Sequence, residues 1–556
     1  LQLIFPNDGL FAIAVEGISS TEKAKLSAKT EEVADLVHYY GSGDNFSACD
    51  RLETVQFKYK LRSEPVTASY LRKTIQKFAA TIVDYEKNFS VDEINRKLSF
   101  LFVTNVEFKP SLWEAIKSLI DDSVPKGSDA STQFKNLKKW CAESKLEDAS
   151  RLFKHIVFKA GEKSIASLDN ALKRTLTDWS SGTDGLARER LLGLQNLVLN
   201  KAGPSGQGKN LIHLEDVLDA LDCVAEDLFP AKTQFIDVGD VIPRAELVTV
   251  NELIQSYEEP VFVHADGGVG KTVFVSSLAS TMEAEYEVVI YDCFGGGSYR
   301  FEHASRHLPK VGLVQIINDL ASRTLCDPLL PDGDDSQKIL RATRKRLNQA
   351  SKAIQTQSTK KGLLIIVDAA DNAQFEADQR HEEAFPKMLL ASLGEDSING
   401  VKLVFTARTH RKDNIIGHTP VHNVELGPFT ETEALEFLSV RKPTASDVEV
   451  AKALARSGRN ARVLDYLIKT WDKNISNEAT DEPITVPEII AQSCESIIRQ
   501  LRIAGWNDSE VIEFFVAISF LPPPIPLDEL ATALGWSAGQ VKTAVSDLAP
   551  MIEMTS

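Results

Sequence analysis

The sequence predicts a multidomain protein that combines α/β regions with purely helical ones. At 556 residues the chain is too long for one hydrophobic core, and usual domain sizes suggest about three to five domains. Strand-like and helix-like patterns alternate near the N-terminus and in the middle, whereas the helical period dominates elsewhere. We expect an α/β region at 1–110, a helical connector at 111–235, a second α/β domain at 236–428, a helical domain at 429–475 and a C-terminal domain at 476–556.

The composition is that of an ordinary globular protein, with 43% hydrophobic and 25% charged residues. No apolar run approaches the ~18 residues of a membrane span, and the N-terminus has no signal-peptide pattern. The six cysteines are scattered without a CxxC pair, which argues against a structural zinc site or a disulfide framework and favours a cytoplasmic location. The net charge of −17 argues against nucleic-acid binding by the whole surface, but residues 51–90 hold eight Lys or Arg against four Asp or Glu.

The strongest motif lies in "VFVHADGGVGKTVFVSSLAS", residues 261–280. An apolar strand enters a glycine-rich loop and an apolar helix leaves it, which is the context that a P-loop requires. The consensus Gly-x4-Gly-Lys-Ser/Thr appears here as Ala265-x4-Gly270-Lys271-Thr272, so alanine replaces the first glycine. A glycine turn without a nucleotide is the alternative.

Each residue type in this loop suits ATP and Mg²⁺. Gly267, Gly268 and Gly270 allow the backbone N–H groups to surround phosphate oxygens at the helix N-terminus. We expect Lys271 to reach the β- and γ-phosphates and Thr272 to ligate Mg²⁺.

Two later strands supply the predicted catalytic partners. In "GLLIIVDAADNA" (362–373), Asp368 ends an apolar run where a Walker B carboxylate holds Mg²⁺, and Asp371 is placed to polarise the attacking water. In "VKLVFTARTHRK" (401–412), Arg408 is a candidate sensor of the γ-phosphate. A buried strand that ends in a solvated Asp is the alternative for Asp368.

A glycine-rich stretch, "YDCFGGGSYRFEHASRHL" (291–308), follows another strand. Loops at the carboxyl ends of parallel strands lie near the ligand in open α/β sheets. We consider two interpretations: a loop that reports the nucleotide state, and a flexible surface turn.

In the N-terminal region, "RLETVQFKYK" (51–60) places Gln56, Lys58 and Lys60 on one face of a strand. The expected order is strand (32–40), strand (51–60), helix (67–86) and strand (96–108), and the first strand offers Asp35. A carboxylate can bind Mg²⁺ beside a phosphodiester, and a lysine can position the attacking water or stabilise the developing charge. The alternative is a polar edge strand whose side chains face solvent.

Gln56 stands where an acid would usually complete the metal shell, so a further carboxylate is expected. The candidates are Glu32, Glu53 and Asp50, and Asp44 is the alternative to Asp35. The expected catalytic set is Asp35, Gln56 and Lys58, with Asp35 and Gln56 as metal ligands.

The central and C-terminal regions resemble STAND ATPases. "DVIPRAELVTVNELI" (240–254) resembles the segment that leads into their nucleotide fold, and its Arg244 is an expected nucleotide contact. "ELGPFTETEALEFL" (425–438) looks like their Gly-x-Pro stretch, so that Pro428 packs near the adenine. Two further stretches, 457–470 and 520–548, are similar to their lid and winged-helix segments.

The N-terminal order and the Asp35…Gln56-x-Lys58 pattern resemble PD-(D/E)XK nucleases of the Mrr-like type, with D…QxK. Together the two resemblances are typical of antiviral STAND (AVAST) proteins. They imply that a C-terminal sensor beyond Ser556 recognises a viral protein, and that ATP then drives assembly of a homo-oligomer, expected to be a tetramer, which activates cleavage of double-stranded DNA.

Two other functions are compatible with the sequence. One is a signalling or transcriptional STAND ATPase whose N-terminal domain only binds a partner. The other is a DNA-translocating motor, which would show steady DNA-stimulated ATP turnover.

Overall fold

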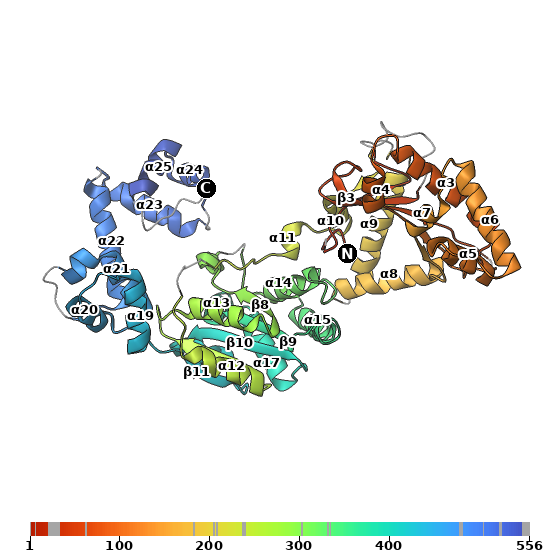
Figure 1. Ribbon diagram of the computed structural model, residues 1–556. Coiled ribbons are helices and arrows are strands. Elements are labelled where there is room, and N and C mark those ends of the chain that lie inside the picture. Colours follow the sequence, from red (N-terminus) through yellow and green to blue (C-terminus); the bar gives the residue numbers. More distant parts are fainter. Residues whose placement is uncertain are drawn as a thin grey trace. The chain divides into compact units, whose positions relative to one another are not determined.

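A computed structural model of the chain describes residues 2–5, 7–19, 34–61, 64–181, 184–203, 206, 209–235, 241–301, 304–330, 333, 335–476, 482–503, 505–521 and 525–547. The chain divides into two compact units (Figure 1). The first comprises Leu1–Leu228 and Ala321–Leu330, and the second comprises Phe229–Leu320 and Pro331–Ser556.

The first unit is built on a six-stranded mixed sheet with the order β5-β4-β3-β2-β1-β6. β1, β2 and β3 are antiparallel neighbours, whereas β3, β4 and β5 run parallel. The strands are β1 Leu10–Val15, β2 Leu36–Gly41, β3 Cys49–Phe57, β4 Leu98–Val103, β5 Ile156–Lys159 and β6 Leu211–Ile212. The helices are α3 Ala68–Tyr85, α4 Val91–Lys97, α5 Pro110–Ile120, α6 Ser128–Glu143, α7 Ala149–Lys154, α8 Ile165–Trp179, α9 Asp184–Ala202, α10 Leu214–Ala220 and α11 Ala225–Leu228.

The predicted strand–strand–helix–strand order is present as β2, β3, α3 and β4, and β1 precedes it. Because strand side chains alternate, the sheet presents two apolar faces. On one face, residues such as Val37, Leu52 and Phe100 form a core with α3, α5, α6 and α7. On the other, Leu10, Val15 and Tyr40 pack with Leu197 of α9 and Val217 of α10. The region expected to be a helical connector therefore also supplies β5, β6 and part of the N-terminal core.

The second unit contains a five-stranded sheet, all parallel, with the order β11-β7-β10-β9-β8. Every residue of β7 and β9 is buried, as expected of parallel strands that are covered on both faces. The strands are β7 Val261–Ala265, β8 Tyr286–Asp292, β9 Gly362–Asp368, β10 Val401–Arg408 and β11 His422–Glu425. The helices around it are α12 Glu246–Ser256, α13 Lys271–Met282, η2 Gly295–Arg300, α14 Pro309–Ser322, α15 Ser336–Gln357, α16 Ala370–Arg380, α17 Phe385–Glu395, η3 Thr409–Arg411 and α18 Lys412–Ile416.

Two helical clusters follow in the chain. The first packs Ala434, Leu438, Val463 and Leu464 around Phe429 and consists mainly of α19 Glu431–Arg441, α20 Asp447–Ser457 and α21 Ala461–Lys469, with η4 Asp472–Ser476 after them. The second consists of α22 Val486–Ile503, α23 Asp508–Phe520, α24 Leu527–Leu534 and α25 Ala538–Asp547. No strand is present among the residues described after 476, so the wing of the predicted winged helix is not seen there.

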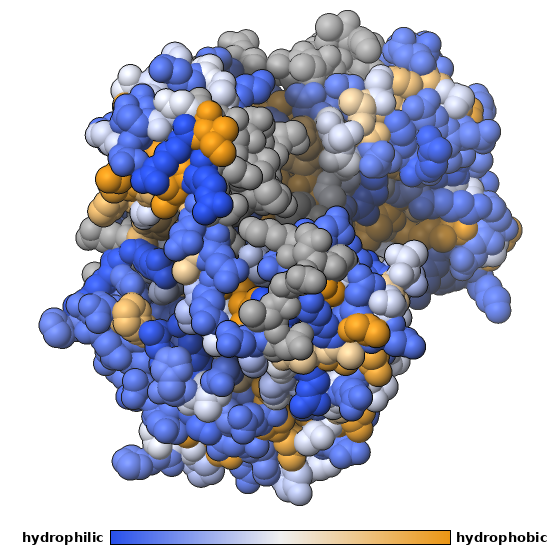
Figure 2. All heavy atoms as spheres, turned by 90° about the vertical axis from the view of Figure 1, so that its left-hand side faces the viewer, coloured by the Kyte–Doolittle hydropathy of each residue, from blue (hydrophilic) through white to orange (hydrophobic). Residues whose placement is uncertain are grey.

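None of the helices in the described ranges is long and apolar enough to cross a membrane. Figure 2 shows a mostly hydrophilic surface on which hydrophobic groups are scattered.

Candidate functional site

The P-loop connects β7 to α13. Gly268 and Gly270 have φ values of +80° and +106°, a region that favours glycine. Ala265, which replaces the first consensus glycine, is the last residue of β7 and pairs in register with Arg408. Its φ is not in the left-handed region, so this position does not require glycine.

Lys271 begins α13 and folds back over the loop. Its Nζ donates hydrogen bonds to the carbonyls of Ala265 and Asp266, both at 3.0 Å. Burial lowers the pKa of Lys271 below its usual value, and the nearby Asp371 and Asp368 partly oppose this shift. The ammonium group is therefore hydrogen-bonded to the loop and is near enough to Asp371 and Asp368 for both carboxylates to raise its pKa.

Asp368 is the last residue of β9, and its carboxylate links the P-loop to the neighbouring strand β10. Thr272 Oγ1 donates to its Oδ2 over 2.8 Å, and Thr406 Oγ1 donates to its Oδ1 over 2.5 Å. Burial raises the pKa of Asp368, although both hydroxyl donors favour the charged form. The sequence pattern did not single out Thr406, because a threonine inside an apolar strand has no distinctive signal.

Asp371 lies in the first turn of α16 and is 2% exposed. Its Oδ1 accepts the backbone N–H of Arg408 at 3.3 Å, and its Oδ2 forms ion pairs with Arg408 Nε at 3.7 Å and Arg411 Nη1 at 3.8 Å. Among the described residues Oδ2 has no hydrogen-bond partner, although it is buried. The structure thus brings Asp371 and Arg408 together, and Lys271 lies near enough for Asp371 to influence its pKa.

A cavity of about 610 Å³ extends from the P-loop. At one end it is lined by Gly268, Gly270, Lys271 and Thr272, and elsewhere by apolar side chains that include Val241, Ile242, Phe429 and Phe437. The polar end suits phosphates and the apolar part suits a planar base. The lining includes Phe429 but not Pro428, so the residue after the expected proline forms that wall.

Arg244 also lines the cavity, but protein groups surround its guanidinium. Nη1 donates to Val269 O at 3.3 Å and Nη2 to Gly427 O at 2.7 Å, while Glu433 lies 3.5 Å from Nε. The side chain is 6% exposed. Arg244 therefore joins Val269 of the P-loop to Gly427, which precedes α19, while it also lines the cavity in which the sequence predicts a nucleotide contact.

The lid helix α21 rests on the P-loop. Asn460 Nδ2 donates to Gly267 O at 3.2 Å, and the Arg462 N–H donates to Gly268 O at 3.0 Å. A Cβ at Gly268 would lie 3.0 Å from both Asn460 Oδ1 and Arg462 Cβ, so glycine is also needed for this contact. The Arg462 side chain lines the cavity and forms no hydrogen bond or ion pair with the described residues. Both residues occur in the stretch that resembled a lid segment, but the sequence gave no reason to select them.

These side chains fit a magnesium–nucleotide complex. The hydroxyl of Thr272 and the carboxylate of Asp368 already lie 2.8 Å apart, and Asp371 presents a buried oxygen that accepts no hydrogen bond within the described part of the chain. Hard oxygen donors of this kind are the ligands that Mg²⁺ prefers.

In the first unit, the structure places Asp35 beside Gln56. Asp35 immediately precedes β2, and its Oδ2 accepts hydrogen bonds from Gln56 Nε2 and from the Phe57 N–H, both at 2.6 Å. Gln56 is 6% exposed and lies on the same sheet face as its register partner Phe102. β3 pairs with β2 on one side and β4 on the other, so the edge-strand interpretation is wrong.

Lys58 lies just beyond β3, which ends at Phe57 rather than continuing to Lys60. Its backbone N–H donates to Val103 O at 2.9 Å, which prolongs the pairing with β4. The Lys58 side chain is partly exposed and forms no hydrogen bond or ion pair with the described residues. Lys60, which was expected on the same face, instead donates from Nζ to the carbonyls of Glu64 and Pro65, both at 3.2 Å.

The structure does not bring three of the four further acidic candidates to this pair. Glu53 lies an odd number of residues from Gln56, on the opposite face, where it contacts His38 at 3.2 Å. Asp50 lies six residues before Gln56, about 20 Å along an extended strand. Asp44 belongs to the β2–β3 connection, at the other end of β2 from Asp35.

The fourth candidate, Glu32, lies outside the described residues. Within the described ranges, no cluster of three or more His, Cys, Asp or Glu side chains is placed to hold a metal. Asp35 and the amide of Gln56 thus supply two oxygen-bearing groups, and a complete metal shell needs a further ligand.

The motifs and geometry of the second unit agree with a comparison with known families. Residues 259–443 match the family model of the NACHT domain. The match spans the P-loop, Asp368, Asp371, Arg408 and the start of the lid, about a third of the chain. The NACHT match supports the predicted STAND-type ATPase over these residues, and the P-loop geometry described above agrees with it.

No curated protein matches the chain. Similar solved structures include a Walker-type ATPase of Pyrococcus abyssi, at 12% identity and a TM-score of 0.34, covering 56% of this chain and 90% of that one. A STAND protein with a tetratricopeptide repeat sensor from Pyrococcus horikoshii follows at 14% identity and 0.33, covering 58% and 40%. DnaA of Aquifex aeolicus with AMPPCP has 11% identity and 0.23, covering 56% and 89%. Values this low carry no conclusion about this chain.

Proposed function

We propose that this protein is an antiphage defence switch in which an ATP-binding NACHT domain controls an N-terminal, Mg²⁺-dependent DNA endonuclease. The observation that carries the nuclease assignment is the contact between Asp35 and Gln56 on two central strands, with Lys58 two residues further along. The NACHT match carries the ATPase assignment.

The topology of the first unit supports this proposal. β1, β2 and β3 form an antiparallel meander, and α3 then connects β3 to the parallel strand β4. This is the order expected for the resemblance to PD-(D/E)XK nucleases. On α3, the basic residues Arg72, Lys73 and Lys77 suit contact with a phosphate backbone rather than with base edges.

We assign one role to each residue of the proposed nuclease site. Asp35 and the amide oxygen of Gln56 would hold Mg²⁺, which, when bound, activates water next to a phosphodiester. In the present arrangement the Gln56 amide donates to Asp35, so metal binding requires the amide to turn its oxygen inward. Lys58 would stabilise the negative charge that develops on the phosphate oxygens.

Control of the nuclease by ATP follows from the contact between lid and P-loop. Asn460 and Arg462 hydrogen-bond the loop that must enclose the phosphates, so nucleotide binding and lid position are coupled. Shifting a two-state protein from 1:99 to 99:1 takes about 5.5 kcal/mol of differential binding. We propose that ATP, a viral protein bound by a C-terminal sensor, and assembly into a homo-oligomer, expected to be a tetramer, together supply it in the cytoplasm.

A phage-challenge assay in cells tests the proposal. Cells that express the full-length protein should survive infection, and Lys271→Ala and Lys58→Ala should each abolish protection. Glu53→Gln, on the opposite face of β3, is the matched control and should retain it. Purified protein should also nick a supercoiled plasmid in Mg²⁺ and ATP once triggered, except in Lys58→Ala and Asp35→Ala. If Lys58→Ala still protects and still degrades plasmid, the N-terminal domain is a binding module and not a nuclease.

A further inference from the structure

The turn after β8 contains three consecutive glycines in the left-handed region. Gly295, Gly296 and Gly297 have φ values of +51°, +62° and +100°. A Cβ at Gly295 would lie 2.6 Å from Arg306 Nε, and one at Gly296 would lie 2.9 Å from Gln234 Oε1. Gly295 and Gly296 therefore make room for the side chains of Arg306 and Gln234, which a surface turn would not need.

Arg306 is 3% exposed, and its hydrogen bonds to the described residues all go to carbonyl groups. Nε donates to Asp292 O at 2.8 Å, and Nη2 donates to Ala231 O at 3.1 Å and to Lys232 O at 2.9 Å. One buried guanidinium thus joins the end of β8 to residues 231 and 232.

Three more hydrogen bonds hold the same short segment, residues 231–234. The Ala231 N–H donates to Oε1 of Gln315 on α14 at 2.9 Å. Thr233 Oγ1 donates to Ile290 O at 3.0 Å, and the Gln234 N–H donates to Asp292 Oδ2 at 3.4 Å. Each of the four residues is thereby bonded to β8, α14 or Arg306, and the chain before them leads directly into the first unit.

The segment 231–234 is bonded to β8, and β8 is the neighbour of β9, which ends at the proposed Mg²⁺ ligand Asp368. Asp292 is the register partner of Asp368, and the Cys293 N–H donates to Asp368 O at 3.0 Å. The glycine turn is also tied to α16, which carries Asp371, because Arg380 Nη2 donates to Arg300 O at 3.4 Å. Asp368 is thus linked to the turn through its backbone carbonyl, and Asp371 is linked to it through the length of α16.

We propose that residues 231–234, clamped by Arg306 and the glycine turn, are the joint through which the nucleotide state is transmitted to the first unit. The proposal rests on the ATP switch proposed above but not on the nuclease. Packed interiors move as discrete bodies, so a shift of the β8 and β9 ends is passed to the clamped backbone rather than absorbed.

Hydrogen exchange read by mass spectrometry tests this joint in the full chain. Peptides covering 229–235 are compared without nucleotide, with Mg²⁺ and ADP, and with Mg²⁺ and a slowly hydrolysed ATP analogue. In the wild type we expect their exchange rates to differ by about threefold or more between the ADP and ATP-analogue states. Arg306→Ala should exchange fast in both states while its nucleotide affinity changes little, and Thr233→Val should reduce the difference.

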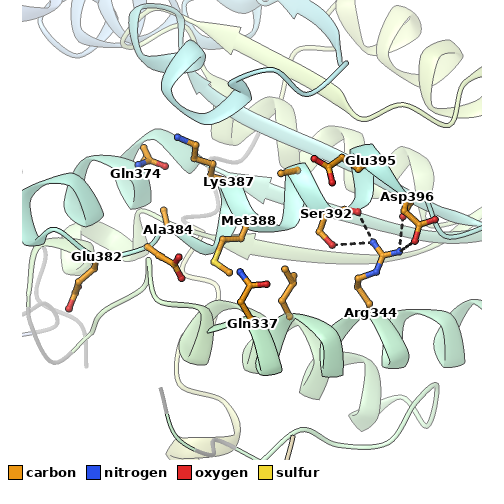
Figure 3. Close-up of a pocket in the computed structure, with 13 residues that line it drawn as sticks. Gln337, Arg344, Gln374, Glu382, Ala384, Lys387, Met388, Ser392, Glu395 and Asp396 are labelled. Carbon is orange, nitrogen blue, oxygen red and sulfur yellow. Dashed lines mark hydrogen bonds and ion pairs between the residues drawn. The ribbon is translucent and has the colours of Figure 1, made fainter. Parts of the chain in front are cut away.

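Arg344 provides a matched control in the same domain. Its guanidinium also binds carbonyl groups, from Ser392 at 2.6 Å and Asp396 at 2.9 Å, but between α15 and the end of α17 (Figure 3). Arg344→Ala should keep the full nucleotide-dependent difference at 229–235.

Two outcomes would overturn the proposal. One is exchange at 229–235 that does not respond to nucleotide in the wild type. The other is a nucleotide-dependent difference in Arg306→Ala that is as large as in the wild type. If Arg306→Ala does not fold, Thr233→Val decides the question. An undiminished difference in exchange between the ADP and ATP-analogue states of Thr233→Val contradicts the proposal. Lys58→Ala should behave as the wild type in this assay, so a failed nuclease assignment leaves the result intact.

Discussion

The carboxylate of Asp35 accepts two hydrogen bonds at 2.6 Å, from the side-chain amide of Gln56 and from the backbone N–H of Phe57. Gln56 is almost fully buried, and an uncharged donor satisfies Asp35 there without a second negative charge. An amide in place of the usual acid therefore stabilises the pair when no cation is bound.

Gln56→Glu should make stability depend on Mg²⁺ and pH. The introduced carboxylate would be buried beside Asp35, so its folded-state pKa should rise above the ordinary value of about 4.3. The free energy of unfolding of the variant should then fall by about 1–3 kcal/mol as the pH rises from about 4.3 through the raised folded-state pKa. Mg²⁺ at pH 8 should raise its melting temperature more than it raises that of the wild type. An equal effect of Mg²⁺ on both proteins would argue against a metal at this pair.

Lys271→Ala should weaken nucleotide binding. The ammonium group lies over the P-loop between Ala265 O and Asp266 O, where it can turn to a phosphate. Loss of a charge-assisted hydrogen bond costs about 1.5–3 kcal/mol, which corresponds to roughly a 10- to 150-fold weaker Kd. Calorimetry with ATP and Mg²⁺ measures this change. Lys352→Ala, on the exposed side of α15, should bind as the wild type does.

Arg462→Ala should lower nucleotide affinity about tenfold, because its side chain enters the cavity beside the P-loop without a protein partner among the described residues. Arg459 is exposed and outside the cavity lining, so Arg459→Ala is the control. Binding of a fluorescent ATP analogue distinguishes the two. Equal affinities would mean that Arg462 acts only through its backbone contact with Gly268.

Binding of Mg²⁺ with ATP should weaken in mild acid. Burial raises the pKa of Asp368 above the usual 3.8, and protonation removes the charge that the cation needs. The affinity for Mg²⁺ with ATP is therefore highest above the raised pKa of Asp368 and falls as the pH drops through that pKa. This loss occurs at a higher pH than it would for an exposed Asp. Titrations of ATP binding from pH 7 down to pH 4.5, with Mg²⁺ and with EDTA, should diverge in the wild type. In Asp368→Asn the two curves should stay parallel, and parallel curves in the wild type would contradict this assignment.

Local sequence was sufficient where the chemistry lies within one short motif. The strand, glycine turn and helix around Lys271 form as predicted, because turn glycines and a fully apolar strand specify them locally. Asp368 and Asp371 likewise follow from their place at the end of an apolar strand. The pairing of Asp35 with Gln56 could also be anticipated, because the two residues belong to consecutive strands that are close together in the sequence.

Tertiary structure alone decided the features that join distant segments. The sequence could not show that β3 is a central strand, because its neighbours β2 and β4 lie on either side of it only after α3 has crossed over. Nor could it place Glu53 with His38, or Arg306 against residues 231 and 232, since these contacts depend on how strands and helices pack. The sequence by itself determined the P-loop motif and the carboxylates at and just after the end of β9, because each lies within one short segment. Only the tertiary structure determined which distant groups, such as Arg462 and Arg306, lie around the ends of the sheet.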